Sequence, residues 1–93
     1  MIRFRVMIID YLPDESLDAD FEAMKRKAKT LKKSLINGPL VIFDDQVNIE
    51  PNLAKGYYIV TIDKIPNSYM KKVFKKCKKI KPYKIEILWY NKD

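Results

Sequence analysis

The sequence predicts an α+β fold in which strands and helices follow one another in the order β-α-β-β-α-β. The chain opens with a strict alternation of apolar and polar residues, two later stretches repeat apolar residues every three or four positions, and prolines separate the elements. A strand repeats every two residues and a helix about every 3.6, so the two patterns distinguish the elements. The 93 residues fit a single domain over 1–93.

The first half of the chain is expected to form a strand, a helix and a second strand. Residues 2–9 start with a strict alternation of apolar and polar side chains, as in a half-buried strand. The helix is expected to begin at Leu17 and to stop at the Asn-Gly-Pro of residues 37–39. The apolar run 40–43 is expected to be the second strand. The helical stripe consists of Leu17, Phe21, Met24, Ala28, Leu31 and Leu35.

The second half is expected to form a strand, a helix and a last strand. Residues 56–63 predict the third strand, which follows a loop. A second helix is expected from Pro66 to about Lys79, and residues 83–90 predict the fourth strand. This order is typical of a ferredoxin-like fold, a four-stranded antiparallel sheet with two helices on one face.

The composition excludes several classes of function. The chain has no histidine, which removes Ser-His and Cys-His nucleophile pairs and every zinc site that needs His. Its one cysteine, Cys77, excludes an internal disulfide and is typical of a reducing compartment. The longest apolar runs are far shorter than the roughly 20 residues of a membrane helix. We therefore expect a cytoplasmic protein without a membrane partner.

Basic residues dominate the second half of the chain. Lys plus Arg number 19 against 12 Asp plus Glu, and nine lysines but no acid lie between Lys64 and Lys84. A helix face that only serves solubility normally mixes charge signs, and like charges repel unless a polyanion neutralises them. The pattern predicts binding of DNA or RNA, with a Lys-rich hyperthermophile surface as the competing interpretation. The expected contacts are Lys71, Lys72, Lys75, Lys76, Lys78, Lys79, Lys25, Lys29 and Lys32.

A second nucleic-acid surface is expected on the face of the sheet that the helices leave open. If Ile2 and Phe4 point toward the helices, Arg3 and Arg5 point to the opposite face. Tyr57 on the third strand is expected beside them. Two arginines and a tyrosine on central strands are similar to the stacking platform of an RNA-recognition module. The alternative is that Tyr57 is there as a good strand former.

Two groups of acids stand out against the basic background. The stretch "LPDESLDADFE" (12–22) holds five acids, and two aspartates follow the apolar run in "LVIFDDQVNIEP" (40–51). Mg²⁺ binds carboxylate oxygens that separate chain segments bring together. The alternative is that these acids cap a helix and form a turn. The candidate metal ligands are Asp18, Asp20, Asp44 and Asp45.

The stretches "IRFRVMIIDYLPDESLDADFEAMKRKA", "GPLVIFDDQV" and "AKGYYIVTI" resemble RusA-like Holliday-junction resolvases over residues 2–62. The Asp-x-Asp pair at Asp18 and Asp20 and the Asp-Asp pair at Asp44 and Asp45 match the motifs of that family. The resemblance implies a small, basic, dimeric, Mg-dependent endonuclease of phage or prophage origin. It implies that Asp18, Asp20 and Asp45 are catalytic.

Three function hypotheses follow from the sequence. The first is a non-catalytic nucleic-acid-binding accessory or regulatory protein encoded by a phage or mobile element. The second is a Mg-dependent, RusA-like, structure-specific DNA endonuclease. The third is an inhibitor that binds a nucleic-acid-handling protein complex. The partners are therefore DNA or RNA, a protein complex, or a second copy of the chain as a homodimer, and no cofactor is expected apart from Mg²⁺ in the second hypothesis.

Overall fold

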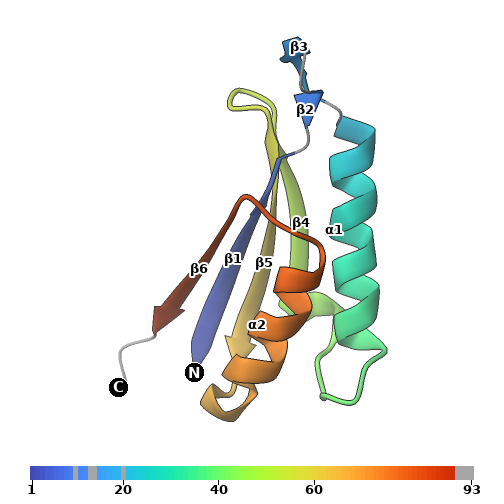
Figure 1. The fold of residues 1–93 in the computed structure, drawn as a ribbon. Coiled ribbons are helices and arrows are strands. Elements are labelled where there is room, and N and C mark those ends of the chain that lie inside the picture. The colour runs from blue at the N-terminus through green and yellow to red at the C-terminus, as the bar shows by residue number, and fades with distance from the viewer. Residues whose placement is uncertain (10, 13–14, 20, 90–93) are drawn as a thin grey trace.

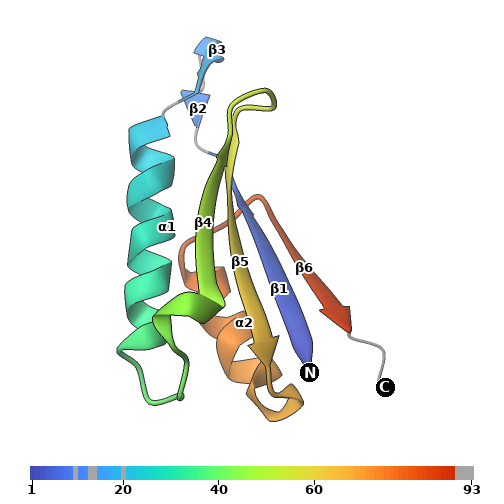
Figure 2. The same ribbon diagram turned by 180° about the vertical axis from the view of Figure 1, so that it is seen from behind.

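The computed structural model describes residues 1–9, 11–12, 15–19 and 21–89 and shows an α+β protein. Four strands form an antiparallel sheet in the order β4-β5-β1-β6. Both helices lie on one face of this sheet (Figures 1 and 2). The predicted α+β class with a four-stranded antiparallel sheet is therefore confirmed. The elements of this core are β1 (Ile2–Ile8), α1 (Phe21–Ile36), β4 (Val47–Asn52), β5 (Tyr57–Ile65), α2 (Met70–Lys79) and β6 (Lys84–Trp89).

Side chains of β1 alternate between the two faces of the sheet, as the sequence predicts. Every second residue from Ile2 to Ile8 is fully buried. Arg3, Arg5 and Met7 are half-buried on the opposite side, which we call the open face. The two helices close the core from the other side. The fully buried helix residues are Met24, Ala28, Leu31 and Leu35 of α1 with Val73 and Cys77 of α2.

Among the described residues, no helix is long and apolar enough to cross a membrane.

The first helix begins later than the sequence predicts. Leu17 lies in the short strand β3 (Glu15–Ala19), which pairs with β2 (Tyr11–Leu12) in a separate two-stranded sheet, and α1 starts at Phe21. The prediction was wrong because Leu17 fits the helical spacing by chance. The helical stripe itself is confirmed from Met24 to Leu35, where every apolar position of the pattern is buried.

The strand predicted over 40–43 is also wrong. In this run Val41 and Phe43 are 64% and 63% exposed, and only Ile42 is buried. The strand of this region is β4, which pairs with β5 through Val47 opposite Ile62. Its pattern was hard to detect because it is interrupted by polar residues and a proline, which an edge strand tolerates.

Asp44 and Asp45 lie in a short 3₁₀ helix, η1 (Asp44–Gln46), that leads into β4. Gln46 fixes this turn to the end of β5. Its Oε1 accepts a hydrogen bond from the backbone N–H of Phe43 at 2.8 Å, and its Nε2 donates to the carbonyl oxygen of Lys64 at 3.1 Å. The two aspartates therefore start a strand rather than end one.

The second helix follows a 3₁₀ turn, η2 (Asn67–Tyr69), and ends at Lys79 as predicted. The backbone then reverses through Lys81, whose φ of 53° lies in the left-handed region. This position after a helix is usually glycine, because a Cβ there is strained by roughly 1–2 kcal/mol. The reversal leads directly into β6 along the edge of the sheet (Figure 1).

Candidate nucleic-acid interface

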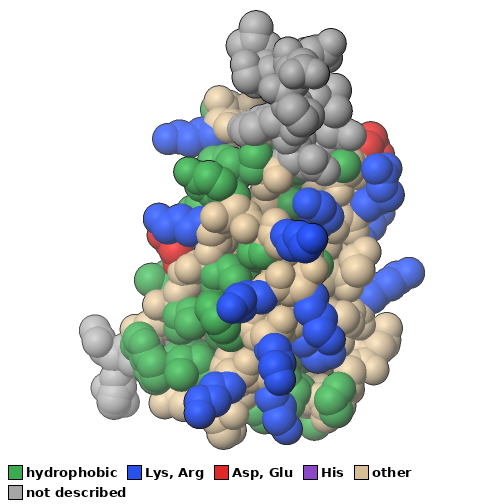
Figure 3. Space-filling model, in the orientation of Figure 1, with side chains coloured by type: hydrophobic (Ala, Val, Ile, Leu, Met, Phe, Trp, Pro, Cys, Tyr) green, Lys and Arg blue, Asp and Glu red, His purple; other side chains and the backbone are tan. Residues whose placement is uncertain are grey.

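Six lysines of α2 form a basic surface, which we call the basic tract. All of them are exposed except Lys76, which is half-buried. The helix has no acidic residue, and no lysine of α2 forms an ion pair with any carboxylate in the described part of the chain. Figure 3 shows lysine and arginine side chains gathered over α2 and the neighbouring flank of α1. The basic tract consists of Lys71, Lys72, Lys75, Lys76, Lys78 and Lys79.

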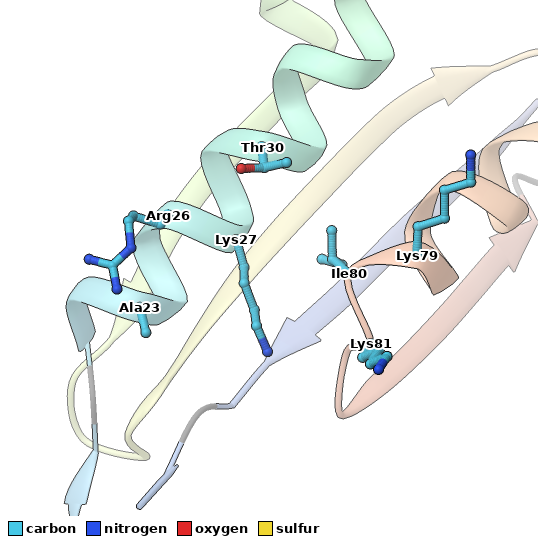
Figure 4. A pocket seen from close by; sticks show the side chains of 7 residues that line it. All are labelled: Ala23, Arg26, Lys27, Thr30, Lys79, Ile80 and Lys81. Carbon is cyan, nitrogen blue, oxygen red and sulfur yellow. The ribbon is translucent and has the colours of Figure 1, made fainter.

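A groove of about 570 Å³ separates α1 from the end of α2. From α1, Lys27 extends into the space between the helices, and Ile80 faces it from the other side (Figure 4). Its apolar residues are Ala23 and Ile80, and its side chains include no aromatic ring. We call this the interhelical groove. It is lined by Ala23, Arg26, Lys27, Thr30, Lys79, Ile80 and Lys81.

A smaller hollow of about 170 Å³ lies on the other side of Lys79, between α2 and the chain that follows α1. Gly38 allows this chain to turn close against the last turn of α1. A Cβ at Gly38 would lie 2.6 Å from the carbonyl oxygen of Ser34 and 3.3 Å from Nζ of Lys76. Because Lys79 lines both depressions, they form one basic path along α2. The smaller hollow is lined by Pro39, Leu40, Lys72, Lys75, Lys76 and Lys79.

The structure places the predicted α1 contacts away from this path. Lys25, Lys29 and Lys32 do not line the interhelical groove, and Nζ of Lys32 lies 3.2 Å from Oδ1 of Asp44 on the opposite flank of α1. The cations of α1 that do line the groove are Arg26 and Lys27. Sequence reasoning missed them because the apolar stripe has two polar flanks, and only packing shows which flank faces α2.

Lys81 is a third cation that the sequence did not single out. It lies beyond the predicted helix end, in a backbone conformation that disfavours any residue with a Cβ. The strained turn places its side chain at the interhelical groove together with Lys79. Lys81 therefore adds a cation to the groove at a position that the helical pattern of the sequence does not indicate.

The arginines of the open face have acidic partners. Nε of Arg3 lies 3.1 Å from Oδ1 of Asp63, and Nη1 of Arg5 lies 3.4 Å from Oε1 of Glu86. Tyr57 is half-buried on β5, at the far end of this face from Arg3. Nucleic acid would have to compete with two carboxylates for these arginines, so the open-face platform stays a prediction.

The predicted metal ligands are only partly described. Asp20 lies outside the described residues, as does the side chain of Asp18. Asp44 and Asp45 are exposed, and Asp44 contacts Lys32. Along the axis of α1, Lys32 lies about 16 Å from the first residue of the helix, Phe21, at a rise of about 1.5 Å per residue. Among the described residues no group of three or more acids, cysteines or histidines gathers as a metal site would require.

The one thiol of the chain is buried away from the interface. Cys77 is fully buried beneath α2, and desolvation raises the pKa of its thiol to about 12. The thiolate that would react is therefore strongly disfavoured at neutral pH. Cys77 serves α2 as a small core residue, as its place on the apolar stripe predicts.

Comparisons with known proteins do not assign the chain to a family. No family model, curated protein or solved structure matches it. The RusA resemblance therefore stays a prediction.

Proposed function

We propose that this protein binds nucleic acid without catalysis, through the basic tract of α2 and the interhelical groove. The observation that carries the proposal is that six lysines of one short helix lack any ion pair with the described carboxylates. Unpaired like charges on one surface destabilise the fold unless a polyanion binds there. A phosphate backbone also gains binding free energy by releasing counterions.

The chemistry of the groove favours contacts with the phosphate backbone over contacts with bases. Its cations are Arg26, Lys27, Lys79 and Lys81, and none of its side chains is an aromatic on which a base stacks. Phosphate contacts fix the position of a nucleic acid but carry no sequence information. We therefore expect binding that depends strongly on salt and weakly on sequence.

We infer further that the fold is ferredoxin-like. The supporting observations are the strand order β4-β5-β1-β6, the antiparallel pairing of all neighbours, and the position of each helix between two strands in the chain. In this arrangement the two helices lie side by side, which gives the chain a groove between two basic elements.

The proposal is tested by fluorescence anisotropy with labelled single-stranded DNA, duplex DNA and RNA over a range of salt concentrations. We expect binding at about 50 mM salt with an affinity that falls linearly on a log-log plot, with a slope of about −0.7 to −0.9 per phosphate contact. A flat salt dependence, or the absence of binding to all three nucleic acids at low salt, would contradict the proposal.

A matched pair of variants separates the site from the net charge. Lys79→Gln removes the lysine that lines both depressions, and Lys55→Gln removes an exposed lysine in the turn between β4 and β5. Both lower the net charge by one. We expect Lys79→Gln to weaken binding by about threefold to tenfold and Lys55→Gln by less than about twofold, since a lost direct contact costs more than a lost distant charge.

A further inference from the structure

The two edges of the sheet differ in how they are protected. At one edge, β4 contains Pro51, which has no N–H to offer a further strand. At the other edge, β6 has no proline and carries Leu88 and Trp89, which are 43% and 59% exposed. An edge strand without proline and with exposed apolar side chains is a site at which another strand can pair.

An apolar groove runs beside this edge. It has a volume of about 410 Å³ and lies between α2 and β6. Phe74 and Ile85 form its apolar wall, and the side chain of Tyr83 is 69% exposed. Figure 3 shows apolar side chains in a band along this flank of the molecule. We call this the edge groove, lined by Phe74, Lys78, Lys81, Pro82, Tyr83, Lys84 and Ile85.

We propose that β6 and the edge groove bind an extended segment of a partner protein, in which apolar residues alternate with acidic residues. The segment pairs with β6 as a fifth strand. One row of its side chains continues the row formed by Ile85, Ile87 and Trp89 and packs against the edge groove. The six residues of β6 offer a pairing length of about 20 Å.

The charge of the edge groove selects an acidic partner. Lys78, Lys81 and Lys84 line it, and Nζ of Lys78 lies 5.5 Å from the ring centroid of Phe74. Glu86 already engages both Arg5 and Lys84, so it does not neutralise the other two lysines. A second copy of the chain is disfavoured, because pairing two β6 strands would bring the lysines of both copies together in molecules of net charge +7.

The fluorescence of Trp89 reports directly on this interaction. It is the one tryptophan of the chain, and it is the last residue of β6, on the same face of the strand as Ile85 of the edge groove. The probe is a synthetic peptide of alternating Val and Glu residues, titrated into the full chain. We expect a blue shift of the Trp89 emission and at least a twofold fall in its quenching by acrylamide, because a paired strand covers the ring. No change in either signal on saturation with this peptide would overturn the proposal.

Two further peptides separate strand pairing from simple charge attraction. A peptide of the same composition with all valines at one end retains the charge but cannot place its apolar side chains on one face. A Val-Lys peptide retains the alternation with the opposite charge. We expect the first to bind at least tenfold more weakly than the alternating Val-Glu peptide and the second not to bind. Equal effects from the scrambled peptide would overturn the proposed pairing.

Variants locate the interaction on the protein. Tyr83→Ser removes an exposed ring at the edge groove, whereas Leu53→Ser removes a 74% exposed side chain from the turn between β4 and β5. Both substitutions replace exposed side chains, and circular dichroism confirms that each variant is folded. We expect Tyr83→Ser to weaken binding of the Val-Glu peptide by at least threefold and Leu53→Ser to leave it unchanged. The reverse order would place the peptide elsewhere and overturn the proposal.

The same signals keep this proposal separate from nucleic-acid binding. Lys78 and Lys81 also line the edge groove, but Trp89 lines neither depression of the basic path. We therefore expect DNA at saturation to leave the acrylamide quenching of Trp89 unchanged. Protection of Trp89 by DNA but not by the Val-Glu peptide would assign the edge groove to nucleic acid and overturn the docking proposal. Analytical ultracentrifugation tests the homodimer, and a dimer that the Val-Glu peptide dissociates would assign β6 to a second copy instead.

Discussion

The helix face and the open face of the sheet both carry cations, but they differ in whether those cations form ion pairs with carboxylates. On the open face Arg3 and Arg5 each lie against a carboxylate, from Asp63 and Glu86. On the helix face the lysines of the basic tract have no such partner among the described residues. Charge that is neutralised within the fold serves the fold, whereas charge that is left unpaired is available to a partner.

The strongest test of this difference is a pair of triple variants. One variant replaces three lysines of the helix face with Gln, at Lys72, Lys75 and Lys76. The other replaces three cations of the open face with Gln, at Arg3, Arg5 and Lys84. Each variant therefore removes three positive charges. We expect the helix-face variant to lose about 10- to 100-fold in affinity for single-stranded DNA and to lower the magnitude of its salt slope by about 2. The open-face variant is expected to change affinity by less than about threefold. Equal losses would show that net charge alone drives binding.

The stability of the helix face is expected to depend on alkaline pH. Only Val73 and Cys77 of α2 are fully buried, and burial raises the pKa of the Cys77 thiol to about 12. The folded state therefore holds the thiol proton where the unfolded state releases it. Its contribution is complete below the unfolded pKa of 9.0 and is lost as the pH rises toward 12.

We expect the free energy of unfolding to fall with pH above 9.0 by about 1.4 kcal/mol per unit from this thiol alone. Urea denaturation over this pH range measures the slope. Cys77→Ala retains every lysine, so the difference between the two proteins isolates the thiol from the loss of lysine charge. If the free energy of unfolding falls equally with pH in both proteins, the result would contradict the burial of the Cys77 thiol against the core.

The two lysines with left-handed backbone allow a finer comparison. Lys81 lies at the interhelical groove, and Lys64 lies near the end of β5 with the same φ of 53°. Replacement by glycine relieves similar strain at both, so we expect each variant to change stability by less than about 1 kcal/mol. Only Lys81→Gly is expected to weaken DNA binding, by about twofold to fivefold. A loss of similar size in Lys64→Gly would remove Lys81 from the interface.

The smallest effect on DNA affinity is expected when the carboxylates that pair with the arginines of the open face are removed. Asp63→Asn and Glu86→Gln together remove the two carboxylates beside Arg3 and Arg5 and raise the net charge by two. We expect less than about a twofold gain in DNA affinity, since distant charges are screened at physiological salt. A gain of fivefold or more would show that the open face binds nucleic acid once its arginines are free.

Much of the fold follows from local patterns. The alternation at the start of β1 and, from Met24 onward, the stripe of α1 appear in the structure with the predicted residues buried. The predictions of a strand over 40–43 and of a helix beginning at Leu17 were wrong, because hydrophobicity alone does not show which residues pair with another strand. β4 was missed for the same reason, since its pairing with β5 outweighs its polar residues and Pro51.

The candidate site was predictable in part. The lysines of α2 could be identified from the sequence, because a run without acids is visible there. Arg26, Lys27 and Lys81 could not, since their role depends on which flank of α1 faces α2 and on a backbone reversal after the helix. The ion pairs of the open face join residues up to 81 positions apart and depend on strand register.

The most direct test of the central claim is an NMR titration of the ¹⁵N-labelled protein with short single-stranded DNA. The account predicts that the largest amide shift changes fall on α2 and on Arg26, Lys27 and Lys81, and that the side-chain Nε signals of Arg3 and Arg5 keep their positions. Changes concentrated at Arg3, Arg5 and Tyr57, with α2 unaffected, would contradict it.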